Sequence, residues 1–328
     1  VNNGLNWNNF GNTGGLDDKG ISALAVNDDA IWIATAFSTK QDGESLSSGG
    51  GLYYSTNRGQ TWTSVPQPLD AGTVNDTLYG NNTIKMLAIT TVVNNVTFDI
   101  TLTRNTVWIA SFAGMLRKST DRGLTWRNVI LPPDDLNSIK PSDSLDFDLA
   151  PTGGRLGLRG NLNHRVFSVF ASDDSTIWVG TAGGINRSTD GGISWQKFSH
   201  QNQSNAISGN FVVALNEQRW GSRRTIWAAT INAEQPDEIR GVSYSDDGGQ
   251  NWKTALLGEF AHNISFKDSV VYIATDGGLF RSSDFGDSWV RSGTVYDNAN
   301  LQRFASTAIY ATAASGDTIW VGGSEGIA

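Results

Sequence analysis

The sequence predicts an all-β fold, a β-propeller of four-stranded antiparallel blades, and two repeated patterns predict it. The first is an octet of the form S-x-D-x-G-x-x-W, as in Ser188–Trp195. The second is a short run of β-branched and aromatic residues, as in Ile177–Thr181, which precedes the octet. Because both patterns return along nearly the whole chain, we expect residues 1–328 to form a single closed repeat domain.

The octet predicts a hairpin turn that stabilises itself. Asp190 can accept backbone N–H groups across the turn, and Gly192 supplies the positive φ that a side chain disfavours. The tryptophan then starts the returning strand and buries a large ring. We predict structural roles for the acidic or amide position, held by Asn57, Asp121, Asp190, Asp247 and Asp284, and for the aromatic position, held by Trp62, Trp126, Trp195, Trp252 and Trp289.

This octet is the Asp-box, and on these residues the chain resembles the Asp-box (BNR-repeat) β-propellers. That group includes sialidases, sortilin-like receptors, glucan hydrolases and photosystem-assembly factors. The resemblance implies the fold but no single activity, because the group contains both enzymes and binding proteins. Sialidases of this group carry an Arg-Ile-Pro motif that is missing from this sequence, so no catalytic residue is carried over from them.

The β-branched and aromatic runs predict buried strands. They are Ile31–Thr35, Val107–Ser111, Ile177–Thr181, Ile226–Thr230, Val271–Thr275 and Ile319–Gly323. Another strand and a tight polar turn precede each run, as in Phe167–Ala171 followed by Ser172–Ser175. One repeat is therefore a first strand, a turn, a second strand, a loop, a third strand, the Asp-box turn and a fourth strand.

The two ends of the chain predict how the ring closes. Gly4–Trp7 matches the second half of an Asp-box, so Asn6–Phe10 is expected to complete the blade formed by residues 301–328. Six second strands then predict six blades, and closure removes exposed sheet edges. Because the chain starts at Val1, inside a repeat, we expect it to be a processed or excised part of a longer chain or assembly.

Composition argues against several classes of partner and cofactor. The net charge is −8, whereas nucleic-acid binding requires a basic surface. The chain has no cysteine, and its three histidines lack the spacing of a metal site, so we expect no metal and no cofactor. No apolar run reaches membrane-spanning length, so we expect no membrane insertion.

Most long insertions fall on the face opposite the Asp-boxes, which we call the long-loop face. They are Phe37–Gly50, Pro66–Asn82, Ile130–His164, Ser199–Gly209 and Asn232–Arg240. An additional hairpin is expected where Ile89–Val93 and Val96–Ile100 flank Asn94 and Asn95. Long loops on a rigid scaffold often carry binding sites, although they can also be tolerated surface insertions.

The candidate binding residues lie mainly in and beside the longest insertion. They are Asp134, Asp135, Asp143, Asp146, Arg155, Arg159 and Arg165. Paired carboxylates could serve acid–base chemistry and arginines could bind an anion, or the segment is a solvated loop whose charges pair locally. If function lies on the long-loop face, excision of Pro133–Asn163 should leave the propeller folded but abolish or weaken partner recognition. Trp220, in an enlarged turn on the Asp-box face, could stack on a sugar or a partner, or pack back on its blade.

Three functional classes remain. The favoured one is a non-catalytic, secreted or cell-surface propeller that binds a protein or glycan through its long-loop face, with the periplasm as a further location. The second is a glycoside hydrolase of sialidase type. The third is a structural or assembly module of a larger surface protein.

Overall fold

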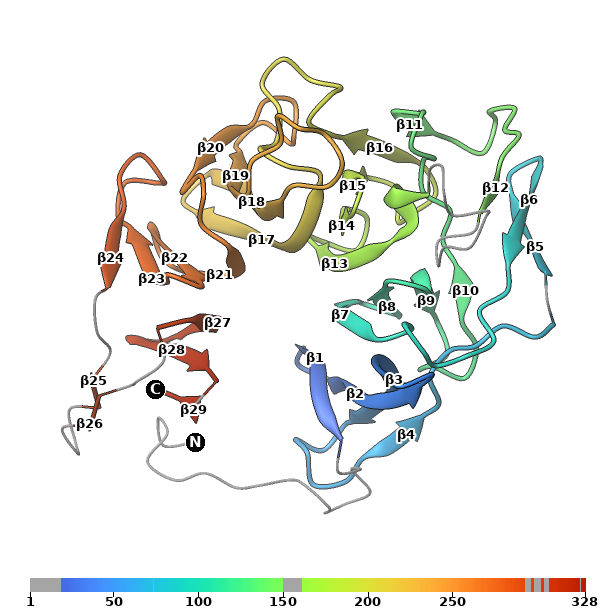
Figure 1. The fold of residues 1–328 in the computed structure, drawn as a ribbon, viewed down its shortest axis with the longest axis horizontal. Helices are drawn as coiled ribbons and strands as arrows, with labels where there is room; N and C mark the ends of the chain where they lie inside the picture. Colours follow the sequence, from blue (N-terminus) through green and yellow to red (C-terminus); the bar gives the residue numbers. More distant parts are fainter. Residues whose placement is uncertain are drawn as a thin grey trace. The chain divides into compact units, whose positions relative to one another are not determined.

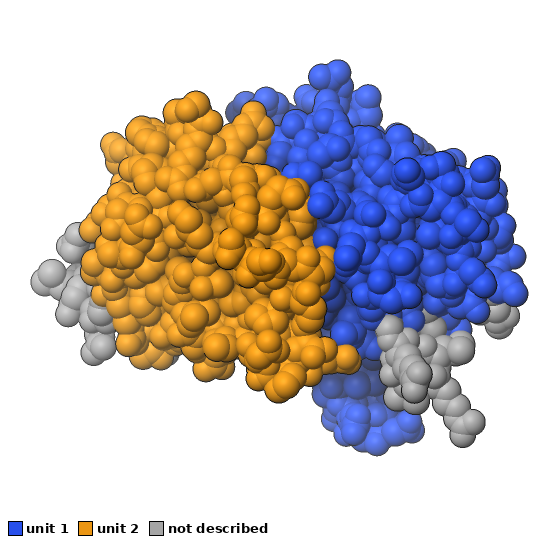
Figure 2. Space-filling model, turned by 90° about the horizontal axis from the view of Figure 1, so that it is seen from above, with its two compact units in different colours: residues 1–197 blue, residues 198–328 orange. Residues whose placement is uncertain are grey.

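The structure, a computed structural model, describes residues 19–72, 74–149, 161–292, 296–297, 302–303, 307–324 and 326–328. The chain divides into two compact units, residues 1–197 and 198–328 (Figure 2). The predicted strand Asn6–Phe10, and with it the predicted ring closure, lies outside the described residues, as do Arg155 and Arg159. The described residues form mainly antiparallel sheets, as the sequence predicts, with one parallel strand pair (Figure 1).

Unit 1 contains three sheets that follow the predicted strand order. Sheet A consists of β1 (Gly20–Val26), β2 (Ile31–Gln41), β3 (Glu44–Ser55) and β4 (Thr63–Val65). Sheet B consists of β7 (Thr97–Thr103), β8 (Thr106–Ser111), β9 (Met115–Ser119) and β10 (Arg127–Asn128). Sheet C consists of β13 (Val166–Ala171), β14 (Ile177–Thr181), β15 (Gly184–Ser188) and β16 (Trp195–Phe198), which ends at the unit boundary.

Unit 2 repeats the same strand order. Sheet D consists of β17 (Phe211–Trp220), β18 (Arg223–Ile231), β19 (Gly241–Ser245) and β20 (Lys253–Ala255). Sheet E consists of β21 (Ala261–Lys267), β22 (Val270–Thr275), β23 (Gly278–Ser282) and β24 (Val290–Ser292). Sheet F consists of β27 (Ile309–Ser315), β28 (Thr318–Gly323) and β29 (Gly326–Ile327), and β25 (Tyr296–Asp297) pairs with β26 (Gln302–Arg303) before it.

The Asp-box turns have the same hydrogen-bonding pattern in sheets A to E. In sheet C, Asp190 Oδ1 accepts the N–H groups of Ile193 at 3.1 Å and Ser194 at 2.9 Å. Ser188 Oγ donates to the same oxygen at 2.7 Å and accepts the N–H of Gly192 at 2.8 Å. In sheet B, hydrogen bonds from Thr125 hold the pKa of the equivalent Asp121 at about 2. The hydrogen bonds of these serine and aspartate side chains therefore lie within the octet to which each belongs.

The glycine of an Asp-box also sets the distance between neighbouring sheets. Gly192 has a φ of 80°, and a Cβ on it would lie 2.6 Å from Cη2 of Trp108 in the sheet before. Gly286 has a φ of 96°, and its Cβ would lie 2.7 Å from Cη2 of Trp227. Both tryptophans are buried in the apolar layer between sheets. Any larger residue would push these layers apart as well as strain the turn.

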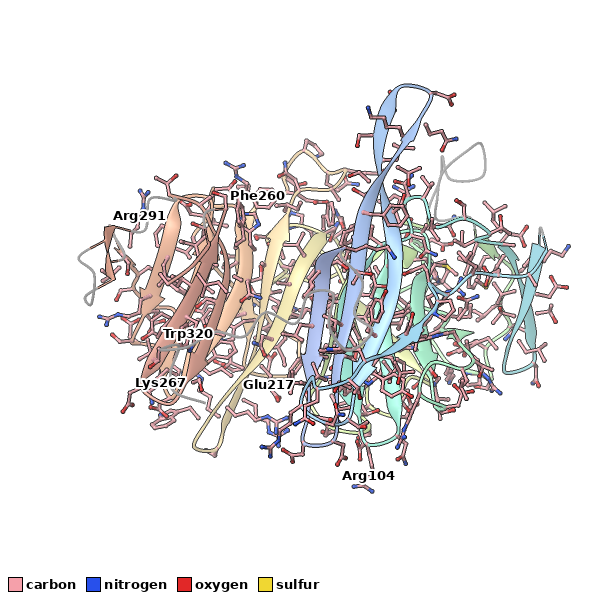
Figure 3. The ribbon with its side chains drawn as sticks, turned by 90° about the horizontal axis from the view of Figure 1, so that it is seen from below. Arg104, Glu217, Phe260, Lys267, Arg291 and Trp320 are labelled. Carbon is pink, nitrogen blue, oxygen red and sulfur yellow. The ribbon has the colours of Figure 1, made fainter. Side chains whose placement is uncertain are left out.

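Two insertions predicted as loops, Phe37–Gly50 and Pro66–Asn82, contain β-strands instead. Phe37–Gly50 continues the β2–β3 ladder up to the pair Gln41 and Glu44, so this hairpin projects beyond the rest of sheet A (Figure 3). The additional hairpin is formed by β5 (Val74–Tyr79) and β6 (Asn82–Leu87). The predicted hairpin of Ile89–Val93 and Val96–Ile100 is wrong. Residues 97–100 belong to β7, and the buried Asn95 side chain instead donates to Pro68 O, which joins two loops.

The prediction that Pro133–Asn163 can be excised is also wrong. Its β11 (Ser138–Ile139) adds a fifth strand to sheet C, and its β12 (Asp148–Leu149) pairs in parallel with β6. Ile139 and Leu149 lie in the main apolar core of unit 1. The ammonium of Lys197 donates to the carbonyls of Pro133 at 3.0 Å and Asp134 at 2.7 Å. Excision would therefore open the core of unit 1.

Candidate functional site

The first strand of each of sheets A to F contains a β-bulge near its beginning. In sheet B, Thr97 pairs with Ser111 and Asp99 with Ala110, so Phe98 has no partner on β8. The unpaired positions of sheets A to F are Ser22, Phe98, Phe167, Val213, His262 and Tyr310. Bulges re-aim side chains and are common beside functional sites. We call these six the bulge residues; they lie at the long-loop end of their sheets, where the first strand begins.

In unit 1, the bulge residues Phe98 and Phe167 form an aromatic surface, which we call the phenylalanine site. Their ring centroids are 5.3 Å apart, and Phe98 is 41% exposed. Phe112, which follows β8, lies 6.0 Å from Phe167. The guanidinium of Arg165 lies 5.4 Å from the centroid of Phe112. The rings of Phe98, Phe167 and Phe112 and the guanidinium of Arg165 thus form one series of neighbouring groups.

Asp99 supports the phenylalanine site from the residue after the bulge. Its Oδ1 accepts the N–H of Ile100 at 2.8 Å, and its Oδ2 accepts the N–H of Val169 on β13 at 2.9 Å. A second link runs from the N–H of Ala171 to Thr101 Oγ1 at 3.2 Å. Burial raises the pKa of Asp99 to about 7, although both N–H groups favour the carboxylate. The two strands that carry the rings are therefore joined directly.

In unit 2, the bulge residues His262 and Tyr310 form the histidine site. Their ring centroids are 5.1 Å apart in an edge-on arrangement, and the centroid of the Phe260 ring lies 4.9 Å from that of His262. Tyr310 is 48% exposed, and His262 Nε2 lies 2.7 Å from Asp276 Oδ1. Asn263 Oδ1 accepts the N–H of Thr312 at 3.1 Å and so joins β21 to β27. This is the same strand-to-strand link that Asp99 makes in unit 1.

Both sites offer exposed ring faces beside a small number of polar groups. Such surfaces suit ligands that have one flat apolar face and hydrogen-bonding edges. Among the described residues, no three His, Asp or Glu side chains are grouped so that they could hold a metal ion. The described part of the chain also contains no helix long and apolar enough to cross a bilayer.

The candidate residues of the longest insertion do not form one site. The Asp134 carboxylate accepts the N–H groups of Leu162 at 2.9 Å and Asn163 at 2.8 Å, at the short 3₁₀ helix η2 (Leu162–His164). Asp143 accepts the N–H of Lys140 at 2.9 Å, and Asp135 and Asp146 are exposed. These carboxylates therefore serve local structure or face solvent. Among the candidates that the structure describes, Arg165 alone joins the phenylalanine site.

The neighbouring His164 is a core residue. Its side chain is buried, and Nε2 accepts the N–H of Leu131 at 3.2 Å. Burial lowers the pKa of His164 to about 3. The imidazole is consequently neutral near neutral pH and holds the beginning of the insertion in place.

Trp220 lies at the opposite, Asp-box end of its sheet and is exposed. The enlarged turn predicted around it is wrong, because β17 and β18 pair up to Trp220 and Arg223 and leave a turn of only Gly221 and Ser222. In the structure, the backbone of both strands stays extended and hydrogen-bonded through the residues that the sequence predicted as a turn.

Sequence reasoning missed the bulge residues. A signal was available, because an aromatic or histidine follows the opening residue of four first strands, at Phe98, Phe167, His262 and Tyr310. Strict alternation places Phe167 and Val169 on one face of a strand. The bulge after Val166 breaks that alternation, and a bulge is difficult to foresee in a single sequence.

Comparison with known proteins supports the repeat and the fold. A family model described as BNR/Asp-box repeat matches residues 53–64, 187–197 and 243–254. The chain is 28% identical over 289 residues to a xyloglucanase of Acetivibrio thermocellus, covering 82% of the chain and 32% of the enzyme. The Asp-boxes of sheets B and E, outside the matched residues, make the same turn hydrogen bonds.

Two solved structures have the same fold at low sequence identity. A protein of B. thetaiotaomicron, named as the extracellular domain of a hybrid two component system, has a TM-score of 0.55 at 13% identity, covering 96% of this chain and 34% of that chain. The GH74 xyloglucanase of Xanthomonas campestris has a TM-score of 0.53 at 17% identity, covering 94% and 44% respectively. The chain thus spans less than half of each of these relatives.

Proposed function

Because the chain is an Asp-box β-propeller, we propose that it binds a neutral polysaccharide without cleaving it. The observation that carries this proposal is the pair of exposed aromatic surfaces that the bulges create, the phenylalanine site and the histidine site. Similarity to a xyloglucanase over most of the chain favours a glycan over a protein ligand.

The rings are suited to a sugar because they are exposed and already fixed. A pyranose presents a flat face of C–H groups, which can cover Phe98 or Tyr310 and remove apolar area from water at about 25 cal/mol per Å². Arg165, over the Phe112 ring in one site, and His262 with Asp276 in the other provide polar groups beside the exposed rings. The hydrogen bonds of Asp99 and Asn263 hold the platforms before binding, which lowers the entropy cost of association.

Binding without hydrolysis is favoured by the use of the carboxylates. Glycoside hydrolysis commonly needs two carboxyl groups about 5–10 Å apart on either side of the scissile bond. At the phenylalanine site, both oxygens of Asp99 already accept backbone N–H groups. In the adjoining insertion, both oxygens of Asp134 do the same. These acids are therefore poorly placed to exchange protons with a sugar.

Calorimetric titration with xyloglucan oligosaccharides tests the proposal. We expect Phe98→Ala and Tyr310→Ala each to weaken binding by about tenfold or more, the size typical of a central aromatic contact. Leu124→Ala is the matched control, because Leu124 is an exposed apolar residue in an Asp-box turn and its removal should leave affinity unchanged. Unchanged affinity in both aromatic variants would refute the assignment of the sites. Release of reducing ends by the wild-type chain would refute the non-catalytic role.

The same proposal places the protein outside the cytoplasm, at the cell surface or secreted. The B. thetaiotaomicron relative is named as an extracellular domain, and a polysaccharide ligand is met outside the cell. Detection of the protein in the surface or medium fraction of its source cells would support this location, and retention in the cytosolic fraction would contradict it.

A further inference from the structure

A cavity of about 610 Å³ lies between sheets A and B at their Asp-box ends, and we call it the Asp-box cavity. It is bounded by the turn between β1 and β2, the turn between β7 and β8, and the Asp-box turns of both sheets. Arg104, in the β7–β8 turn, marks the end of unit 1 opposite the projecting β2–β3 hairpin (Figure 3). The cavity is separate from the sites at the long-loop end, because no bulge residue lines it.

The base of the Asp-box cavity is aromatic. Trp32 and Tyr54 both line it, and they stack with ring centroids 4.9 Å apart and an interplanar angle of 26°. Trp32 is 3% exposed, whereas Tyr54 is half-buried. Within the described part of the chain, no group forms a hydrogen bond with the Tyr54 hydroxyl. Tyr54 therefore offers the cavity both a ring and a hydroxyl.

The corresponding place between sheets D and E is closed. Trp227 and Tyr244 form the same stack there, with centroids 4.4 Å apart, and Tyr244 is only 4% exposed. Arg223 makes a two-point ion pair with Asp246, at 3.1 Å from Nε to Oδ1 and 2.6 Å from Nη2 to Oδ2. The same guanidinium lies 4.3 Å from the centroid of the Phe285 ring. Burial raises the pKa of Tyr244, and the charges of Asp246 and Arg223 act on the same hydroxyl, so both lie beside the stack.

Two positions of the Asp-box octet distinguish the open place from the closed one. Phe285 is the fourth residue of its octet, and the fourth residue of the sheet B octet is Arg122. Asp246 is the second residue of its octet, and the second residue of the sheet A octet is Thr56. Both Arg122 and Thr56 line the Asp-box cavity. A guanidinium and a hydroxyl thus stand where sheets D and E have a phenyl ring and an ion-paired carboxylate.

Arg122 is the cation available to a ligand. Its side chain is exposed, and no group of the described residues forms an ion pair or a hydrogen bond with it. Arg104, by contrast, is held by Asp174, with 3.3 Å from Nε to Oδ2 and 2.7 Å from its backbone N–H to Oδ1. Among the described residues that line the cavity, Asp29 is the only carboxylate, so the two arginines outnumber it.

We propose that the Asp-box cavity binds a short acidic sugar of one or two uronic acid rings, with a carboxylate paired with Arg122 and a ring beside Tyr54. A guanidinium matches a planar carboxylate through two parallel hydrogen bonds. Four threonines and two asparagines among the lining residues supply hydroxyl and amide groups for the hydroxyls of a sugar. The volume lies within the range of about 300–1,000 Å³ that is usual for small-molecule sites. This site is additional to the neutral-glycan sites at the long-loop end.

Calorimetric titration with digalacturonate tests this site. We expect Arg122→Gln to weaken binding by about tenfold or more, because it removes a charge-assisted pair. Tyr54→Phe should weaken binding by about fivefold, because the hydroxyl is lost and the ring remains. The dimethyl ester of digalacturonate, which carries no charge, should bind the wild type about tenfold more weakly than the acid does. The ester should bind Arg122→Gln as tightly as it binds the wild type.

Matched controls separate this site from general charge and from the proposed function. Arg58 is the fourth residue of the sheet A octet, has the same φ of 58° as Arg122 and is exposed, but it does not line the cavity. Arg58→Gln and Phe98→Ala should therefore leave digalacturonate binding unchanged, and Arg122→Gln should leave xyloglucan binding unchanged. The proposal would be overturned by absence of wild-type binding, by equal binding of wild type and Arg122→Gln, by an equal loss in Arg58→Gln, or by equal affinity for acid and ester.

Discussion

Strands β7 and β21 occupy the same place in sheets B and E but carry different chemistry. Each has a bulge residue followed by a side chain that accepts an N–H from the next first strand: Phe98 and Asp99 in β7, His262 and Asn263 in β21. The backbone link is the same, at 2.9 Å and 3.1 Å. An amide therefore suffices for the link, and the carboxylate of Asp99 gives β7 a titrating group that β21 lacks at this position.

The largest expected effect on stability comes from the protonation of His164. This effect must be measured separately, because it would otherwise obscure the pH dependence that Asp99 gives to β7. Because its folded pKa is about 3, below the ordinary value of 6.5, His164 contributes stability above pH 6.5 that is lost as the pH falls toward 3. The loss is on the order of 3–5 kcal/mol at about 1.4 kcal/mol per pKa unit. Urea unfolding between pH 7 and 4 should show a smaller loss in His164→Gln, whose amide oxygen can still accept the N–H of Leu131. An equal loss of stability in the wild type and in His164→Gln would contradict the assignment of this pH dependence to His164.

The ionisation of Asp99 should lower the stability as the pH rises, whereas the protonation of His164 lowers it as the pH falls. Its folded pKa of about 7 is raised above the ordinary value of 3.8, so its contribution is present below pH 3.8 and is lost as the pH rises through 7. We expect a loss of about 2–4 kcal/mol, and Asp99→Asn should remove this slope while leaving one N–H without its acceptor. Unfolding of both proteins at pH 5 and pH 8, in the His164→Gln background, measures the slope. If the stability of the two proteins changed equally between pH 5 and pH 8, a group other than Asp99 would be responsible for the change.

Replacing each acceptor side chain by alanine compares the two strand-to-strand links, that of Asp99 and that of Asn263. Asp99→Ala leaves two backbone N–H groups unpaired and should destabilise the protein by about 1–3 kcal/mol, whereas Asn263→Ala leaves one and should cost about 1 kcal/mol. Chemical denaturation at pH 7 tests both variants. If Asn263→Ala proved the more damaging, the β21–β27 link would be the stronger one.

The smallest expected effect extends the comparison of amide with carboxylate to the Asp-boxes. Asn57 Oδ1 accepts the N–H of Thr61 at 2.9 Å, and its Nδ2 donates to Thr61 Oγ1 at 2.8 Å, so an amide forms this turn in sheet A. Asp190→Asn should consequently change stability by about 0.5 kcal/mol or less, and Asp190→Ala by about 1–3 kcal/mol. Thermal unfolding of the two variants distinguishes these outcomes, with Asp146→Ala as the exposed control. A large effect of Asp190→Asn would mean that the turn needs the charge.

By itself, the sequence determined the parts of this protein whose bonds are local. The Asp-box turns close within eight residues, and the second strands are recognisable because continuous β-branched runs are buried on both faces, as in the fully buried β14. Those two signals suffice for the sheets, the strand order and the fold class. They also identify Asp190 and its equivalents as turn residues.

Only the tertiary structure decided where the candidate sites lie. Phe98 and Phe167 become neighbours because Asp99 bonds to Val169, 70 residues away, and because a bulge turns each ring out of the alternating pattern. In the insertion after Ile130, for which the charges left a solvated loop as one interpretation, the described residues Ile139 and Leu149 are instead buried in the core of unit 1. Such contacts depend on which surfaces meet after the sheets have packed, and a charge or periodicity pattern along one strand does not contain that information.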